Sequence, residues 1–428
     1  MLLPHESFSV ICALSVGLGI YCEKQFNIQA TISLLITSLI IVASLGLSAY
    51  YLPDLFFIDI IDNIRAIPFA DVFLSYMLGI LLYAGSVHVD TKFVKSAGLE
   101  IVSLAIVATL GSILLIAIAM HSVSIVLGIH LNWIDCLVFG SIISPTDPIA
   151  VLGLLKQLKA PQKLSTIIAG ESLFNDGVGI VAFSVLTSAK MEVIDLSILS
   201  IISTFMKMAI GGILLGILAY FSLKVLFRSI DLSITQKILC TITYTISGYE
   251  ICEVLGVSGA LYVVILGLST SHLISNFKDK EQILLFWAVI DEFLNSILFI
   301  MIGTLAIGLH FTGTLGYLAV SSILIVLIAR FICVNLNLSI VHLYKPQPKY
   351  LGSLITWSGL RGGLAIALAL CVPQTDIEAY RTILLLTYAN VIFSVIIQGI
   401  TSENLLKWYL KIHQPVKSNA GFNQERVN

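Results

Sequence analysis

Long apolar runs alternate with short clusters of charged residues, proline and glycine along most of the chain. About 20 apolar residues in a helix can cross roughly 30 Å of hydrocarbon, so each such run is a candidate membrane span. The thirteen candidates cover approximately 6–21, 29–51, 69–87, 97–128, 132–157, 164–188, 197–227, 236–254, 257–274, 283–309, 314–343, 350–373 and 381–406. The pattern predicts an all-α polytopic membrane protein with a short polar cytoplasmic tail over 407–428.

The composition supports a membrane location. Apolar residues make up 58% of the sequence and charged residues 11%, whereas soluble globular proteins carry about 25% charged residues. A lipid-facing surface needs no charges, but a water-facing one cannot be built almost without them. The net charge of -2 offers no basic field for a phosphate backbone, which excludes nucleic acid as a partner. The lipid bilayer is the expected surroundings of this chain.

The basic residues predict how the chain is oriented. Loops are numbered here by the segment that they follow. Even-numbered loops hold only Arg65, Lys190 and Arg381, while most of the other lysines and arginines lie in odd-numbered loops and the C-terminal tail. Because cytoplasmic loops are enriched in Lys and Arg, we expect the N-terminus outside and the C-terminus in the cytoplasm. The expected location is the cell membrane, as in the inner membrane of a bacterium.

Thirteen segments divide into six, one and six, and a shift of seven segments inverts the orientation. Inverted-repeat transporters have this property, and their binding sites are marked by Gly- or Pro-interrupted helices at matching positions of the two halves. The fifth segment carries Ser144-Pro145-Thr146-Asp147-Pro148. The twelfth carries Gly359-Leu360-Arg361-Gly362-Gly363. Proline removes a backbone donor and leaves carbonyls without their helical partners. We therefore predict two broken helices whose freed carbonyls face a water-lined ion site.

Ionisable side chains inside the apolar segments need a reason, because each costs at least about 2.5 kcal/mol at mid-bilayer. Residues three and four apart lie on one helix face, so the run GESLFNDG places a polar stripe on the sixth segment. The candidate residues are Asp147, Glu171, Ser172, Asn175, Asp176, Arg330 and Arg361.

Two interpretations of these charges stay open. In the first, carboxylates and arginines form structural ion pairs that lock the helices together. This suits Glu171 and Arg330, because an arginine does not give up its proton. In the second, the charges build an ion site, and this suits Asp147 and Asp176 beside the proline-broken helix.

Hard oxygen donors surround these two acids in the sequence, namely Thr146, Ser172, Asn175 and the freed carbonyls. Oxygen ligands suit a small hard cation. A desolvated carboxylate also binds a proton more readily, so proton and cation binding would compete.

Four motifs, in order, resemble those of a known family. SPTDPIAVLGLLK, GESLFNDGVGIVAF, DEFLNSILFIMIG and WSGLRGGLAIALAL resemble the monovalent cation:proton antiporters of the bacterial NhaP type and their animal sodium/proton exchanger relatives. The resemblance runs from the third segment to the thirteenth. It implies a thirteen-helix homodimer in one transporter domain. Core helices over 97–188 and 314–406 would move against dimerisation and scaffold helices over 6–87 and 197–309.

The resemblance also implies a role for each polar residue. Asp176 would carry the cation and the proton in turn, with Asn175 beside it. The cation site would comprise Asp176, Asp147, Thr146 and Ser172, Glu171 would pair with Arg330, and Arg361 would sit on the second broken helix. An Asn-Asp pair in this family goes with electroneutral, one-for-one exchange.

The third segment departs from the family pattern. The family often has a carboxylate there, in a run such as LLFEGAL, where this chain has Leu82-Tyr83-Ala84-Gly85-Ser86. A funnel role for that acid is absent here, which affects the expected pH threshold more than the function. Further along, Asp291 and Glu292 beside Asn295 are as consistent with a solvated or paired position as with an accessory role.

The leading hypothesis is a secondary antiporter that exchanges Na⁺, or Li⁺ or K⁺, for H⁺ by alternating access, without a cofactor, in sodium and pH homeostasis. One alternative is a cation channel or an organic-anion carrier that uses Arg361. An intramembrane enzyme is disfavoured because the sequence has no HExxH, GxSxG or nucleotide-binding loop.

Overall fold

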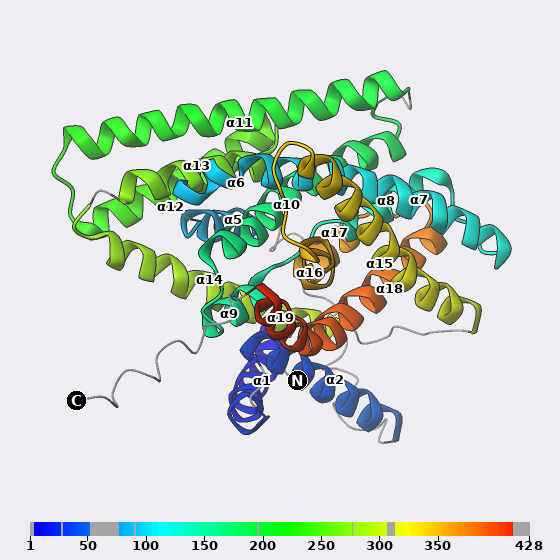
Figure 1. The fold of residues 1–428 in the computed structure, drawn as a ribbon. Coiled ribbons are helices and arrows are strands. Elements are labelled where there is room, and N and C mark those ends of the chain that lie inside the picture. Colours follow the sequence, from blue (N-terminus) through cyan, green and yellow to red (C-terminus); the bar gives the residue numbers. More distant parts are fainter. Residues whose placement is uncertain are drawn as a thin grey trace, which may run out of the picture.

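A computed structural model describes residues 4–26, 29–51, 77–89, 91–194, 197–275, 277–305 and 313–413. The ordered elements in these ranges are helices, which confirms the all-α prediction (Figure 1). The first half contains α1 (Pro4–Phe26), α2 (Ala30–Tyr51), α5 (Leu78–Val87), α6 (Thr91–Ser103), η2 (Leu104–Ala108), α7 (Thr109–Val126), α8 (Trp133–Ile143), α9 (Ile149–Gln157), α10 (Gln162–Lys190) and α11 (Ile198–Ser229).

The helices of the second half also correspond to the predicted segments. It contains α12 (Ile234–Val254), α13 (Gly259–Ile274), α14 (Lys280–Leu305), α15 (Gly313–His342), α16 (Leu351–Ser358), α17 (Gly363–Leu370), α18 (Ile377–Phe393), η3 (Ser394–Gln398) and α19 (Gly399–His413). Within the described ranges, six helices are long and apolar enough to cross a membrane. The count of thirteen spans and the inverted repeat stay predictions.

The ends of several segments differ from the prediction. The third segment, 69–87, is described only from residue 77. The last helix continues past the predicted end at 406 to His413, where the expected tail had already begun, while 414–428 lies outside the described residues. The fourth and last segments each contain a π-helical turn, η2 and η3. Such turns are single insertions that occur mostly at functional sites.

Both predicted helix breaks are confirmed. A capping box of Asn132 and Asp135 starts α8, which ends at Ile143, directly before the Ser-Pro run. The chain becomes helical again at Ile149, the start of α9. The twelfth segment divides in the same way into α16 and α17, with the glycine-rich run between them.

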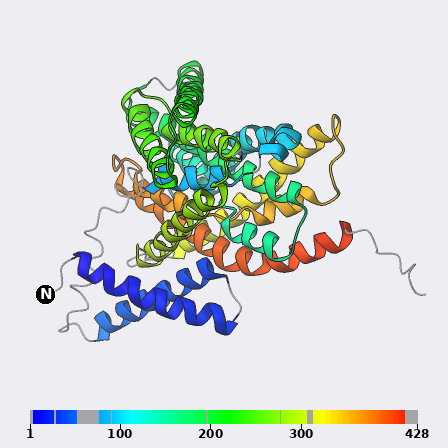
Figure 2. The same cartoon turned by 90° about the vertical axis from the view of Figure 1, so that its left-hand side faces the viewer.

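The long helix α10 lies between two groups of helices (Figure 1). On one side α5, α11, α12, α13 and α14 pack on one another, and on the other side α6 to α9 pack with α15 to α19. Helices α1 and α2 pack together at one edge, where α2 contacts α14 (Figure 2). Both halves of the second break lie in the same group as both halves of the first, so the two breaks can meet beside α10.

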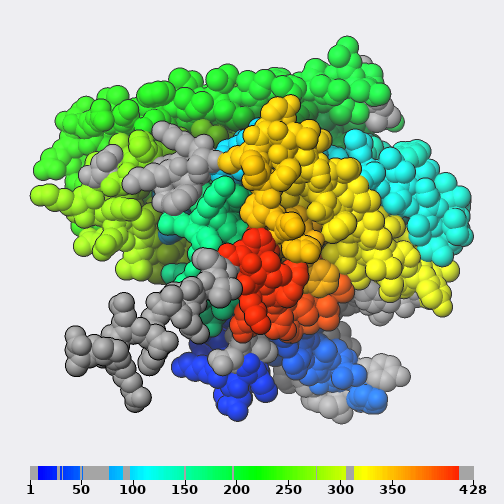
Figure 3. Space-filling model, in the orientation of Figure 1, coloured from blue at the N-terminus to red at the C-terminus, as the bar shows by residue number. Residues whose placement is uncertain are grey.

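Helix α11 forms one border of the molecule (Figure 3). Its outer surface is apolar, with exposed side chains at Leu199, Met206, Leu214, Leu218 and Val225. A soluble protein rarely exposes an apolar surface of this extent. This face is suited to lipid or to another protein subunit.

Candidate functional site

The two helix breaks are joined by their backbones. The Asp147 N–H donates to the Leu360 carbonyl over 2.8 Å, and this contact forms an isolated bridge between the fifth and twelfth segments. Four helix ends therefore meet at one point: the C-terminal ends of α8 and α16, and the N-terminal ends of α9 and α17. Each such end leaves backbone groups without helical partners.

Arg361 supplies partners for the end of α8. In a regular helix the Ser144 carbonyl would accept from residue 148, but that residue is a proline and has no N–H. Arg361 Nη1 donates instead to the Ser144 carbonyl and, over 2.7 Å, to the Pro145 carbonyl. The prediction that a water-lined ion site takes up the freed carbonyls was wrong for these two. A buried guanidinium, 3% exposed, fills that place.

Asp147 lies beside helix N-termini, whereas Arg361 binds the C-terminal end of α8. It stands two residues before α9, and its Oδ2 is so close to Gly362, the residue before α17, that a Cβ there would lie 2.4 Å away. Only glycine leaves room for the carboxylate at this position. Helix N-termini favour negative charge and C-termini positive charge. The signs of Asp147 and Arg361 therefore match the helix ends beside them.

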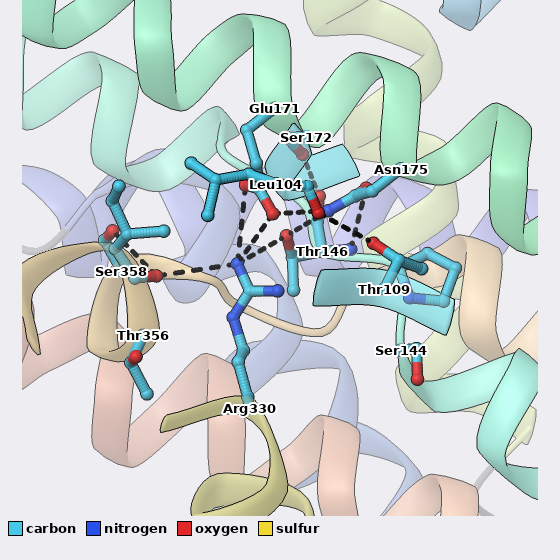
Figure 4. A network of polar contacts seen from close by, with 12 residues as sticks. Leu104, Thr109, Ser144, Thr146, Glu171, Ser172, Asn175, Arg330, Thr356 and Ser358 are labelled. Atoms are coloured by element: carbon cyan, nitrogen blue, oxygen red, sulfur yellow. Dashed lines mark hydrogen bonds and ion pairs between the residues drawn. The ribbon is translucent and has the colours of Figure 1, made fainter. Parts of the chain in front are cut away.

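Glu171, Asn175, Thr146 and Arg330 form a closed network (Figure 4). Arg330 Nη2 lies 3.2 Å from Glu171 Oε1 and donates to Thr146 Oγ1 over 3.1 Å. Asn175 Nδ2 donates to Glu171 Oε1 and to Thr146 Oγ1, each over 2.9 Å. Glu171 is 2% exposed, Asn175 0% and Arg330 4%. This is a buried ion pair whose partners are also hydrogen-bonded, the arrangement that compensates desolvation best.

A cavity of about 140 Å³ lies next to this network, on the other side of the polar stripe. Its walls include Thr146, Asp147, Ser172 and Asp176. A single water needs about 10–15 Å³ on this measure, so the cavity can hold an ion with several waters. Ser172 Oγ donates to the Thr146 carbonyl. The Asp176 carboxylate forms no hydrogen bond or ion pair with any residue that the structure describes.

Comparison with known proteins identifies the family. The family described as "Sodium/hydrogen exchanger, transmembrane" matches residues 10–408, most of the chain. The chain belongs to this family. It is 31% identical over 416 residues to the Na⁺/H⁺ antiporter NhaP of Pseudomonas aeruginosa, covering 94% of this chain and 96% of that one. It is 33% identical over 358 residues to the Na⁺/H⁺ antiporter NhaH of Halobacillus dabanensis, covering 81% and 86%.

The fold matches a solved exchanger. The sodium proton antiporter MjNhaP1 from Methanocaldococcus jannaschii, at pH 8, aligns with a TM-score of 0.71 over 94% of this chain and 97% of that one, at 20% identity. At this identity the likeness concerns the fold. Family membership makes the present chain a multi-pass membrane transporter and not an enzyme.

The exchanger brings only part of the predicted site to the cavity. Asn175, Glu171, Arg330 and Arg361 do not line it. The Thr146 hydroxyl already accepts from Asn175 and Arg330, although the residue borders the cavity. An organic-anion carrier would need a cationic group facing its substrate, and Arg361 is engaged with backbone carbonyls instead.

Of two further groups of residues near the breaks, the first was not predicted, and for the second an accessory role was left open. Ser394 and Gln398 on η3 bind the second break, where Ser394 Oγ accepts from the Arg361 N–H over 2.9 Å and Gln398 Nε2 donates to the Trp357 carbonyl over 3.3 Å. No local motif announces a π-helical turn. Asp291 and Asn295 on α14 line the cavity, and their four-residue spacing inside an apolar segment was the available signal.

Proposed function

We propose that this exchanger carries a monovalent cation, Na⁺ with Li⁺ or K⁺ as alternatives, in exchange for H⁺, with Asp176 binding both ions in turn. The observation that carries the proposal is the contrast between the two acids of the polar stripe. Glu171 is paired with Arg330, whereas Asp176 borders a polar cavity without a partner among the described residues. A carboxylate with a permanent partner cannot release one ion for another, and an unpaired carboxylate can.

The remaining walls of the cavity suit a small hard cation. Asp147 and Ser172 offer oxygen atoms beside Asp176, and Thr146 completes this side of the cavity. Cations of this type bind oxygen ligands. Asn175 and Arg330 fix the position of Thr146, so this wall of the cavity is held by a network that lies outside the cavity.

One carboxylate that accepts either ion makes the exchange one-for-one and electroneutral. Proton and cation then compete, and each is needed to complete the transport cycle. Acid keeps the cation off Asp176, and alkali withholds the proton that the return step needs. A bell-shaped dependence on pH follows without a separate sensor.

Alternating access has a natural division in this fold. The core comprises 97–188 and 314–406, and it moves against the scaffold of 6–87 and 197–309. What supports this is that both breaks lie within one packed group of helices, which α10 contacts through α6 and α8, whereas α5 and α11 to α14 form the other group. The scaffold's apolar α11 face supports a homodimer. The basic loops support an outside N-terminus, a cytoplasmic C-terminus and an inner-membrane location in bacteria.

The test is to reconstitute the full chain in proteoliposomes and measure the cation KM at several pH values, equal on both sides. On the acidic side of the carboxylate's titration, a tenfold rise in proton concentration should raise the KM about tenfold with little change in maximal rate. An imposed membrane potential should not change the rate. A KM independent of pH would reject the shared carboxylate, a voltage-dependent rate would reject one-for-one exchange, and an uncoupled current would indicate a channel.

A further inference from the structure

The wall of the ion cavity that faces α10 is divided between an apolar and a polar part. Helix α5 contributes Leu78, Leu81, Leu82 and Gly85, none of which can ligate a cation through its side chain. Helix α14 contributes Asp291, Asn295 and Leu298. Among the described residues that line the cavity, the acids are Asp147, Asp176 and Asp291, and Asp291 is the one that comes from a scaffold helix, α14.

Asn295 holds Asp291 in place. Its Nδ2 donates to Asp291 Oδ1 over 3.1 Å and to the Asp291 carbonyl over 2.8 Å. Asn295 is 3% exposed and itself lines the cavity. This contact engages one carboxylate oxygen of Asp291, and the other accepts no hydrogen bond from the described residues. Asp291 therefore has an oriented carboxylate with a free oxygen beside the cavity.

The neighbouring acid provides a contrast on the same helix. Glu292 is exposed on the outer surface of α14 and does not line the cavity. Asp291 is instead drawn into a largely apolar environment, where an ionised group is unfavourable unless an opposite charge compensates it. The described residues that line the cavity include no positively charged side chain that could offset this cost. A cation in the cavity would offset it.

We propose that Asp291 is a third acid of the ion cavity, which attracts the cation and holds it beside Asp176 from the scaffold side. The inference rests on the proposed function and adds a residue from a second group of helices to the site. In the predicted orientation α14 starts at the cytoplasm, and Asp291 lies in its first half. The cation entering from the cytoplasm thus meets Asp291 before Asp176 releases its proton.

This role has a consequence for alternating access. Asp147 lies at the first break and Asp176 on α10, which packs most closely on α6 and α8 of the group with the breaks, whereas Asp291 lies on α14 in the other group. If the two groups move relative to each other, the cation keeps its contact with Asp176 and loses its contact with Asp291. Asp291 then raises affinity on the loading side and does not hinder release on the far side.

The experiment compares Asp291→Asn with Glu292→Gln in the full chain in proteoliposomes, with Na⁺ as the probe. Removing the charge of Asp291 should raise the Na⁺ KM about tenfold and leave the maximal rate within about twofold, because a charge that only binds the cation affects KM. Asp291→Glu should restore most of the affinity. Glu292→Gln, which removes an acid one residue away, should leave KM unchanged.

Several outcomes decide the matter. An unchanged KM in Asp291→Asn, with Asp176→Asn inactive in the same assay, overturns this role and leaves the proposed function standing. A fall in maximal rate with constant KM also overturns it, since that would assign Asp291 to the conformational change. Absence of coupled exchange in the unmodified chain would instead reject the proposed function. If Asp291→Asn does not fold, Asp291→Ser, which leaves room for water, carries the same expectation.

Discussion

The polar stripe of α10 has two sides, and an acid on one side has a charged partner while an acid on the other side has none among the described residues. Glu171 and Asn175 of α10 belong to a network in which each charge has a partner. Ser172 and Asp176, each one residue further along, face a cavity. Each side has one acid and one neutral polar residue, within less than two turns of the same helix. Under the proposed function, a buried carboxylate becomes exchangeable where the protein withholds a permanent counter-charge, and structural where it supplies one.

Thr146 connects the two sides. Its hydroxyl accepts from Asn175 and Arg330, its N–H donates to Asn175 Oδ1 over 3.3 Å, and its carbonyl accepts from Ser172. The paired network therefore fixes the backbone of the broken helix directly beside the cavity. A rigid support is important for a functional site, because displacing a site residue by about 1 Å can impair its function.

The largest expected effect comes from neutralising the unpaired acid. Asp176→Asn should abolish Na⁺-driven proton flux in proteoliposomes, because an amide has nearly the same shape but neither titrates nor carries charge. The melting temperature should change little, since the carboxylate has no protein partner among the described residues to lose. Asp231→Asn, at an exposed loop position, is the control and should retain flux. Normal flux in Asp176→Asn would refute its role as carrier.

Breaking the paired side should act on stability instead. Arg330→Ala or Glu171→Gln leaves one buried charge alone, which costs about 3–5 kcal/mol. A lower yield and melting temperature should accompany an almost unchanged cation KM in the protein that folds. The double variant Glu171→Gln/Arg330→Met leaves no charge unpaired and should recover much of the loss. Stable single variants with an altered KM would place the pair inside the ion site.

A smaller effect is expected at the residue that the two sides share. Thr146→Val keeps the shape but removes the acceptor used by Asn175 and Arg330, which costs about 1–3 kcal/mol. Thr146→Ser keeps the hydroxyl and serves as the matched control. Thermal unfolding and Na⁺ KM, measured on the same samples, separate the roles. An unchanged melting temperature with a raised KM would show that the hydroxyl ligates the cation.

The sequence predicted what depends on nearby residues. Prolines at 145 and 148 and glycines at 359, 362 and 363 marked both breaks, and the spacing of Glu171 to Asp176 marked the polar stripe. The Glu171 and Arg330 pair followed from the family resemblance and is present at 3.2 Å. Most helix boundaries were predicted to within about five residues because apolar length decides them locally, but the fourth segment starts at Thr91 and the last one ends at His413.

Contacts between segments that are distant in the sequence could not be predicted. Nothing in the run around Arg361 reveals that its guanidinium would bind the end of α8, nor does the spacing of Asp291 and Asn295 show which helix face meets α10. Lys190, an exception among the even loops, proves to pair with Asp135 over 2.6 Å. Only the tertiary structure shows this pairing.

The guanidinium of Arg361 occupies the place at the first break that a bound metal cation could otherwise fill. In many proteins an irregular stretch of backbone owes its shape to a bound metal ion, and it loses that shape when the ion leaves. Here the carbonyls of Ser144 and Pro145 are held by a guanidinium that is covalently part of the chain and always charged. The empty carrier therefore keeps its architecture, and each transport cycle can pass through an unloaded state without rebuilding the site.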